Sequence, residues 1–398
     1  MEFYHDILEN LLDKLIDYRG KTPKKTLSGV PLVTAKIVKN GTINGYTEYI
    51  AEEDYDKWMV RGFPKVGDVI LTTEAPLGEV ALLKEEKVAL AQRIVCLRGK
   101  DNVLDNTYLK YYLQSGKGQK SLSARESGTT VTGIKQAELR RVDIEYPAYD
   151  DQRRIASILS SLDRKIELNN KINADLEEMA QAVFKNWFVD FEPFKDGKFV
   201  DSELGMIPEG WKVGTLGDIT KNKSAKVKER NDVKVLSPVT TGELVLSEEY
   251  FTKQVFSSSI AKYKIVNKGD FAYNPARVNI GSLGRNEFDF DGCVSPVYVV
   301  FSVLDGYENY FDLFRKTDFF KDSVASLAIG GVRQSLSYDD LSSIEVIIPS
   351  ENAVEEFNNL NNQMKKTIKA NKLENSRLST LRDTLLPRLM SGELEVPE

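Results

Sequence analysis

Histidine and cysteine are nearly absent from this sequence: His5 is the one histidine among 398 residues, and Cys96 and Cys293 are the two cysteines. Ser-His-Asp and Cys-His catalysis both need an imidazole, and zinc sites draw most of their ligands from these two residue types. His5 lies close to the N-terminus, where chains are commonly frayed, so we expect no catalytic role for it. Two cysteines make no disulfide framework, which fits a reducing cytoplasm.

Apolar runs long enough to span a membrane are also missing, and the first residues lack the basic and then apolar layout of a signal peptide. We therefore expect a cytoplasmic protein. The sequence has no Gly-x-x-x-x-Gly-Lys-Ser/Thr phosphate loop, and its paired glycines form no dinucleotide fingerprint. We expect the chain itself to bind no cofactor and no metal.

Two weak resemblances to catalytic motifs are better explained by structure. Asp68 with Glu85-Glu86-Lys87 loosely resembles the acidic cluster of a metal-dependent nuclease, but nothing comparable recurs near Asp270. Residues 273–276, Tyr-Asn-Pro-Ala, lack the second proline and the aromatic residue found in the base-flipping loop of amino-methylating enzymes. The sequence therefore predicts a protein that is not itself an enzyme.

The bulk composition leaves nucleic acid possible as a partner. A net charge of -6 argues against a polycation that coats nucleic acid nonspecifically, but basic grooves can lie on an otherwise acidic surface. The hydrophobic fraction of 41% and the charged fraction of 29% are those of a folded protein and not of a disordered one. The length of 398 residues exceeds one typical core and suits two domains.

The chain repeats itself once. Gly67-Asp68 recurs as Gly269-Asp270, an offset of 202 residues (269 − 67), and Tyr108-Leu109 falls on Tyr310-Phe311 at the same offset. Leu139 likewise falls on Leu341. Chance rarely preserves one register over such a stretch, so the pattern indicates the duplication of a unit of roughly 200 residues.

Each repeat combines a globule of short strands with one long helix. In the first copy, β-branched runs separated by turn residues predict strands at 30–33, 69–71, 79–83, 94–97 and 142–145, with a short helix near 107–113. After residue 151, and again after 353, apolar residues alternate at spacings of three and four without an early proline. The fold class is therefore α+β, with two similar domains separated by a long antiparallel two-helix coiled coil and related by a pseudo-two-fold internal repeat.

One asparagine occupies the apolar seam near the middle of each helix, and the two are at equivalent positions of the repeat. We expect Asn169 and Asn371 to meet or nearly meet and to fix the helix register, although each could instead face solvent through a gap. The predicted organisation is a first domain at 1–150, a first helix at 151–190, an ordered strap at 191–210, a second domain at 211–350, a second helix at 351–390 and a tail at 391–398.

Polar and basic loops recur in both domains and suit DNA. Arginine can hold guanine bidentately, lysine and hydroxyl groups suit phosphates, and glycine-flanked loops allow close approach to a strand. The loops differ in sequence between the two copies, as an asymmetric split site requires. Our candidates for DNA contact are Arg19, Lys21, Thr22, Lys24, Lys25, Lys36, Arg93, Thr129, Thr130, Lys135, Lys223, Lys226, Lys228, Arg277, Asn279, Arg333, Gln334 and Ser335.

Four segments carry a family resemblance that extends over nearly the whole chain. They are residues 151–156 (DQRRIA), 184–188 (FKNWF), 205–211 (GMIPEGW) and 385–392 (LLPRLMSG). Together they resemble the specificity subunits of Type I restriction–modification systems. One departure is that residues 352–356 (NAVEE) lack the Gln-Arg-Arg-Ile of the first copy, so the second helix is expected to begin with different contacts.

The resemblance implies a division of labour with other proteins. Each domain would be a target recognition domain that reads one half of a bipartite site in double-stranded DNA, and the helices would be the spacers that set the gap between the halves. Two methyltransferase subunits would dock on the helices and bring S-adenosylmethionine. Restriction subunits would bring ATP and Mg²⁺ for translocation and cleavage.

Two other functions fit the same sequence. One is the specificity subunit of a modification-only or phage-exclusion methyltransferase complex, which differs from the first hypothesis only in its partners. The other is a coiled-coil adaptor scaffold that does not bind DNA, which would fit the net charge of -6.

Overall fold

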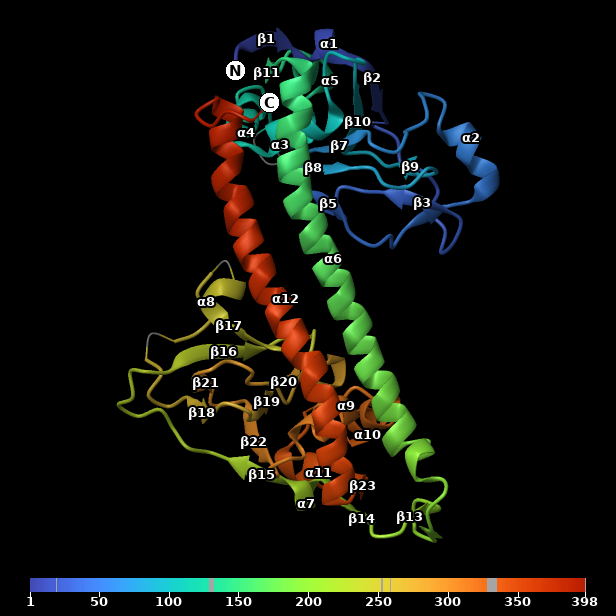
Figure 1. Ribbon diagram of the computed structural model, residues 1–398, viewed down its shortest axis with the longest axis vertical. Helices are drawn as coiled ribbons and strands as arrows, with labels where there is room; N and C mark the ends of the chain where they lie inside the picture. Colours follow the sequence, from blue (N-terminus) through green and yellow to red (C-terminus); the bar gives the residue numbers. More distant parts are fainter. Residues whose placement is uncertain (19, 129–131, 252, 258, 328–334, 398) are drawn as a thin grey trace. The chain divides into compact units, whose positions relative to one another are not determined.

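The computed structural model describes residues 1–398 except 19, 129–131, 252, 258, 328–334 and 398 (Figure 1). The chain divides into two compact units. Unit 1 comprises Met1–Asn170 and Asn371–Glu398, and unit 2 comprises Lys171–Ala370. The long helices α6 (Tyr149–Phe188) and α12 (Glu351–Ser391) both cross this boundary, so each unit contains half of each helix.

The first domain, within unit 1, is a mixed globule of short strands and helices. Its central sheet is antiparallel, with strand order β2-β10-β7-β8, and a smaller sheet has the order β6-β3-β9. Its elements are β1 (Phe3–Ile7), α1 (Leu8–Leu11), β2 (Leu12–Asp17), β3 (Val30–Val33), β4 (Val38–Lys39), β5 (Thr42–Ile43), β6 (Tyr49–Ile50), α2 (Tyr55–Trp58), β7 (Val69–Thr73), β8 (Leu77–Leu82), β9 (Ala89–Leu90), β10 (Ile94–Gly99), α3 (Asn106–Gln114), α4 (Gly116–Ser123), α5 (Gln136–Arg140) and β11 (Asp143–Pro147).

The second domain, within unit 2, repeats this topology. Its central sheet has the order β15-β22-β19-β20, and its smaller sheet has the order β17-β16-β21-β18. Its elements are β14 (Lys212–Thr215), α7 (Leu216–Ile219), β15 (Thr220–Lys223), β16 (Lys234–Pro238), β17 (Leu244–Leu246), α8 (Ser247–Tyr250), β18 (Lys264–Val266), β19 (Phe271–Tyr273), β20 (Leu283–Arg285), β21 (Gly292–Val294), β22 (Val299–Val303), α9 (Glu308–Phe314), α10 (Asp318–Leu327), α11 (Tyr338–Ser342) and β23 (Glu345–Ile348). The internal repeat and the α+β class are thus confirmed.

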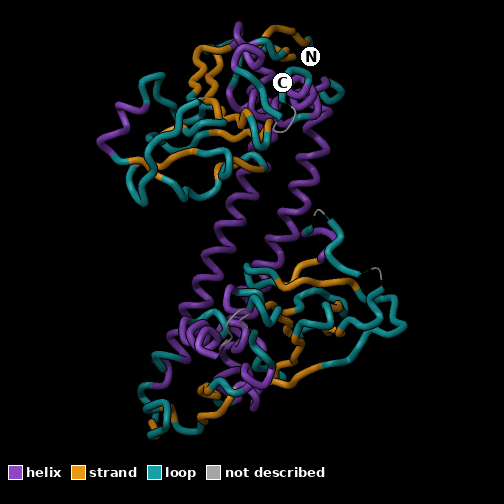
Figure 2. The backbone as a smooth tube through the Cα atoms, turned by 180° about the vertical axis from the view of Figure 1, so that it is seen from behind, coloured by secondary structure: helices purple, strands orange, loops and turns teal. Residues whose placement is uncertain are grey.

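The central strands bury both faces, and their side chains alternate between two cores. In β7, Val69 and Leu71 face the core shared with α3 and α6, whereas Ile70 faces the core of the smaller sheet. In β19, Phe271 and Tyr273 face the helix side and Ala272 faces the smaller sheet. Because side chains alternate with period two, a strand packed on both faces reads as a continuous apolar run. Figure 2 shows these strands grouped in each domain beside the long helices.

The repeated Gly-Asp motif forms the same turn in both domains. Gly67 and Gly269 have φ angles of +86° and +87°, a region that glycine enters at little cost. The following carboxylates accept hydrogen bonds from the turn, Asp68 from the Lys65 N–H at 2.8 Å and Asp270 from the Asn267 N–H at 2.9 Å. Asp68 also binds Arg98 at 2.7 Å. The carboxylate of Asp68 therefore has a structural role.

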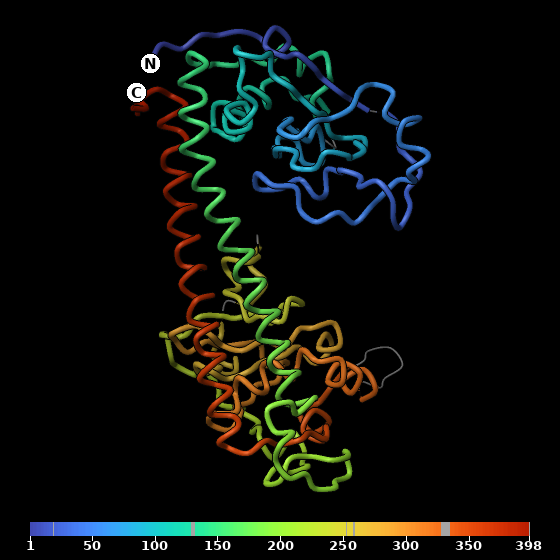
Figure 3. The backbone as a smooth tube through the Cα atoms, turned by 45° about the vertical axis from the view of Figure 1, so that its right-hand side comes forward, coloured from blue at the N-terminus to red at the C-terminus, as the bar shows by residue number. Residues whose placement is uncertain are grey.

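Within unit 1, α6 and α12 pack antiparallel. Asp163 binds Arg382 at 2.8 Å, and Asn169, later in α6, donates to Glu374 and Asn375, earlier in α12. The two ends of the chain lie side by side here (Figure 3), because the Met1 amino group binds Glu395 at 2.7 Å.

Asn169 is fully buried in the helix seam and forms hydrogen bonds with the other long helix. Its amide donates to Glu374 Oε2 at 2.7 Å and to Asn375 Oδ1 at 2.9 Å. Asn375 lies about one helical turn beyond Asn371. Asn375 in turn donates to Asn170 at 2.8 Å. The expectation that Asn169 and Asn371 meet or nearly meet, and their role in fixing the register, stay predictions.

Within unit 2, the strap between the first helix and the second domain is held by aromatic stacking. Trp211 packs against Phe188, Phe191 and Phe194 with ring centroids 5.0 to 5.8 Å apart. The strap adds a two-stranded hairpin of β12 (Phe199–Val200) and β13 (Ile207–Pro208). Among the described residues, no helix combines the length and the apolar character that a membrane span needs.

Candidate nucleic-acid interface

A loop that precedes the last short helix of each domain is anchored in the same way in both. The Ile134 N–H donates to the Thr73 carbonyl at 2.9 Å, and the Leu336 N–H donates to the Pro275 carbonyl at 3.1 Å. These pairs are equivalent at the 202-residue offset, and the apolar side chains of Ile134 and Leu336 are buried beneath the loop. The anchor fixes the end of each loop beside the end of a central strand.

In the first domain, this anchor brings together candidates that are distant in sequence. Glu74 follows β7 and forms a bridge with Gly133, and its carboxylate binds Arg93 at 2.9 Å. A side chain at Gly133 would lie only 2.8 Å from the Thr73 carbonyl oxygen, so the close approach requires glycine. Lys135 is exposed just before α5. Thr129 and Thr130 lie outside the described residues.

In the second domain, the equivalent anchor faces a different set of side chains. Asn274 closes a turn by accepting from the Ala276 N–H at 3.1 Å, which agrees with a structural role for residues 273–276. Arg277 and Asn279 follow in an exposed turn, and Ser335 is exposed beside the anchor. Arg333 and Gln334 lie outside the described residues.

The basic loop after β2 is a second exposed surface of the first domain. Lys21, Thr22 and Lys24 are exposed, whereas Pro23 between them is buried and holds the loop. Lys25 binds Glu48 at 2.7 Å, and Lys36 lies 4.0 Å from the same carboxylate. Arg19 lies outside the described residues. Lys21 and Lys24 are therefore exposed cations of this loop.

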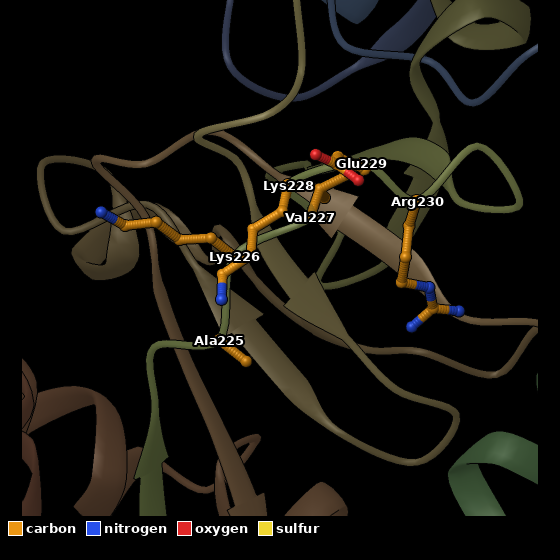
Figure 4. A pocket seen from close by; sticks show the side chains of 6 residues that line it. All are labelled: Ala225, Lys226, Val227, Lys228, Glu229 and Arg230. Atoms are coloured by element: carbon orange, nitrogen blue, oxygen red, sulfur yellow. The ribbon is translucent and has the colours of Figure 1, made fainter.

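The matching strip of the second domain is more varied. Residues 225–230 line an open cavity of about 750 Å³, and Figure 4 shows that Lys226, Lys228 and Arg230 extend from successive parts of it. Arg230 binds Asp232 at 2.6 Å and Asp291 at 3.1 Å, and these contacts raise its pKa above the ordinary value. Lys226 and Lys228 are exposed.

Lys223 lies apart from the other candidates. Its ammonium group binds both carboxylate oxygens of the buried Asp270, at 2.7 and 2.9 Å. This contact occupies in the second domain the place that Arg98–Asp68 occupies in the first. Lys223 is thus engaged within the protein, and its contact with DNA remains a prediction.

The comparisons with known proteins agree with this architecture. The family model of the Type I restriction modification DNA specificity domain matches residues 13–178. The Type I restriction enzyme MjaIX specificity subunit of Methanocaldococcus jannaschii is 29% identical over 95% of this chain and 91% of its own length. The chain is thus similar over almost its whole length to the specificity subunits of Type I restriction–modification systems.

Another specificity subunit and a solved structure are also similar to the chain. The HindI specificity subunit of Haemophilus influenzae is 26% identical over 69% of this chain and 74% of its own length. The crystal structure of the S subunit from M. genitalium, at 18% identity, covers 100% of this chain and 97% of its own with a TM-score of 0.59, which shows a shared fold.

Gln152, from one of the segments that carry the family resemblance, has a structural role in unit 1. Gln152 is fully buried, accepts from the Asp105 N–H at 2.9 Å and donates to the Val103 and Pro147 carbonyls at 2.9 Å. In unit 2, Val354 occupies the equivalent position, and Asn358, one turn later, donates to the Gly306 carbonyl at 2.6 Å. The second helix therefore begins with different contacts, as expected from its sequence.

Proposed function

We propose that this specificity subunit reads a bipartite site in double-stranded DNA, one half with each domain, within a Type I restriction–modification complex. Its helices would set the spacing between the two half-sites. The observation that carries the proposal is the pair of equivalent loop anchors, at Ile134 and Leu336, that present different polar side chains. An asymmetric split site requires the same backbone arrangement in both domains with different DNA-contacting side chains in each.

The chemistry at each anchor supports base and phosphate contact. Arg93 in the first domain and Arg277 in the second can form bidentate hydrogen bonds with guanine, and Lys135 can bind phosphate. The Arg93–Glu74 ion pair is half-exposed, so replacing Glu74 by a hydrogen-bond acceptor of DNA costs Arg93 little free energy.

The chemistry of modification and cleavage would lie on partner subunits. Exposed apolar residues mark the helices in each unit, Leu168, Leu373 and Leu381 in unit 1 and Met179 and Leu360 in unit 2, and suit the docking of two methyltransferase subunits. We propose that these subunits bring S-adenosylmethionine and that restriction subunits bring ATP and Mg²⁺. The chain itself would be non-catalytic and would work in the cytoplasm, where its DNA lies.

The test is methylation mapping by long-read sequencing of plasmid DNA from cells that express this chain with its neighbouring methyltransferase subunit. A split adenine-methylated motif is expected. Arg93→Ala with Lys135→Ala should relax one half of the motif, and Arg277→Ala should relax the other. Lys120→Ala, an exposed lysine at the end of α4, is the matched control and should leave both halves intact.

Two outcomes contradict the proposal. If a methyltransferase complex forms and is active but no split motif appears, the adaptor scaffold is favoured. If Arg93→Ala and Arg277→Ala change the same half, the assignment of one domain to each half-site is wrong. Whether DNA is also cleaved in cells distinguishes a full restriction system from a modification-only or phage-exclusion complex.

A further inference from the structure

The contact between each domain and its long helix contains ion pairs whose signs are opposite in the two units. In unit 1, Lys110 on α3 binds Asp163 on α6 at 2.8 Å. In unit 2, Asp312 on α9 binds Lys365 on α12 at 2.8 Å. Both partners are equivalent at the 202-residue offset (312 − 110 and 365 − 163), so one contact is preserved with its charges exchanged.

A second ion pair, one helical turn further along, is inverted at its helix partner, although Lys84 itself falls on Asn286 at the same offset. Lys84, just after β8, binds Glu167 of α6 at 2.6 Å. At the same offset, Glu167 becomes Lys369, and Lys369 binds Asp289 of the second domain at 3.0 Å. Glu287 adds a further acid beside Lys365 at 3.3 Å. The first domain therefore presents bases to an acidic helix, and the second presents acids to a basic helix.

The inner pairs are buried on the domain side, while their helix partners Asp163 and Lys365 are 20% and 29% exposed. The side chains of Lys110 and Asp312 are 6% and 7% exposed. Asp163 also accepts from Tyr111 at 2.6 Å and from Arg382 at 2.8 Å, and Asp312 also accepts from Arg315 at 2.7 Å. Burial opposes ionisation of both carboxyls, but these cations and donors outweigh it and hold the pKa of Asp163 and of Asp312 below the ordinary value.

We infer that the inverted charges determine which helix each recognition domain can dock on. The two domains share one topology, and the charges act together with a difference in apolar packing, since Ile155 of unit 1 corresponds to Phe357 of unit 2. Placing the first domain on the basic stretch of α12 would set Lys110 against Lys365 and Lys84 against Lys369. Like charges in a buried contact disfavour that pairing, whether it arises during folding or between two copies of the chain.

The decisive experiment duplicates the first domain. In a full-length chimera, residues 3–148 replace residues 212–350, so that a second copy of Lys84 and Lys110 faces Lys369 and Lys365. We expect a Tm below that of the natural chain by about 5–10 °C. Adding Lys365→Asp and Lys369→Glu should restore most of that loss, because it recreates the acidic surface of α6.

The same helix change should have the opposite effect in the natural chain. There, Lys365→Asp and Lys369→Glu set acids against Asp312, Glu287 and Asp289, and we expect a fall in Tm of several degrees. Lys366→Asp, an exposed neighbour with the same change of charge, is the matched control and should shift Tm by no more than about 1–2 °C. If Lys365→Asp with Lys369→Glu lowers Tm in both the chimera and the natural chain, or in neither, the inference is wrong.

If the chimera is insoluble with either helix sequence, the Lys84–Glu167 ion pair of unit 1 provides the test of the inference. Lys84→Glu and Glu167→Lys should each lower Tm by about 1–3 °C, and the double variant should return to the Tm of the natural chain. Additive losses in the double variant show that the two charges are not coupled and overturn the inference. The proposed DNA reading is tested separately, because all of these variants are assessed by Tm and the point variants alter no candidate DNA-contacting residue.

Discussion

Replacing Gln152 by valine should destabilise unit 1 by about 3 kcal/mol. The Gln152 side chain forms three hydrogen bonds of 2.9 Å to backbone groups of Asp105, Val103 and Pro147, in a site where it is fully buried. Each hydrogen bond contributes about 1 kcal/mol, and a buried backbone group left without a partner costs about 1–3 kcal/mol. Valine occupies the equivalent position 354 in unit 2 and therefore fits a helix of this kind.

A loss of this size is readily measured. For a folding unit of about 200 residues, about 3 kcal/mol lowers Tm by about 6–12 °C. Thermal unfolding of the purified chain followed by circular dichroism measures the shift, and hydrogen exchange at Asp105 shows whether unit 1 is affected. Arg153→Ala, an exposed neighbour in the same motif, should change stability by no more than about 0.5 kcal/mol. If Gln152→Val unfolds within about 2 °C of the natural chain, the three hydrogen bonds do not hold the helix to the domain.

Three further predictions concern the helix seam, acid stability and the strap. Asn169→Leu should raise Tm by a few degrees in thermal unfolding, because Asn169 Oδ1 is buried without a partner and leucine suits an apolar seam. The folded-state pKa of Asp312 lies below its unfolded value, so its contribution is complete at neutral pH and is lost as pH falls below about 4. Asp312→Asn should therefore lower Tm more at pH 7 than at pH 3. Trp211→Ala should cost about 3–5 kcal/mol and make residues 195–206 sensitive to limited proteolysis, since it removes the ring on which Phe188, Phe191 and Phe194 pack.

The main elements of the fold were predictable because they carry strong periodic signals. The expected strands correspond to β3, β7, β8, β10 and β11 with ends shifted by up to two residues, and the expected short helix is α3. The polar helix α4 and the strands β1 and β2 were missed, because their side chains alternate weakly and their stability comes from tertiary packing.

The candidate site was predictable only in part. Repeated loops identified Lys135 and Ser335, but nothing in the sequence places Glu74 beside Arg93 or joins Ile134 to Thr73. The sequence could not distinguish Lys223 from the nearby candidates Lys226 and Lys228, because its ion-pair partner Asp270 is distant in sequence. Asn169 was correctly placed in the seam, but its hydrogen bonds to Glu374 and Asn375 could not be predicted, because a shift of one turn leaves the apolar pattern unchanged.

The duplication separates what both halves share from what each half has changed. The Gly-Asp turn and the loop anchor are the same in both domains, so they belong to the frame that presents the readers. The contacts between domain and helix have diverged: Gln152 is replaced by Asn358 one turn later, and Lys110–Asp163 is replaced by Asp312–Lys365. Random drift would leave unmatched charges at such buried sites, whereas both partners have changed sign together. The exchange of sign at both partners therefore keeps each ion pair intact, and the duplicated-domain chimera measures whether that match decides which helix a domain docks on.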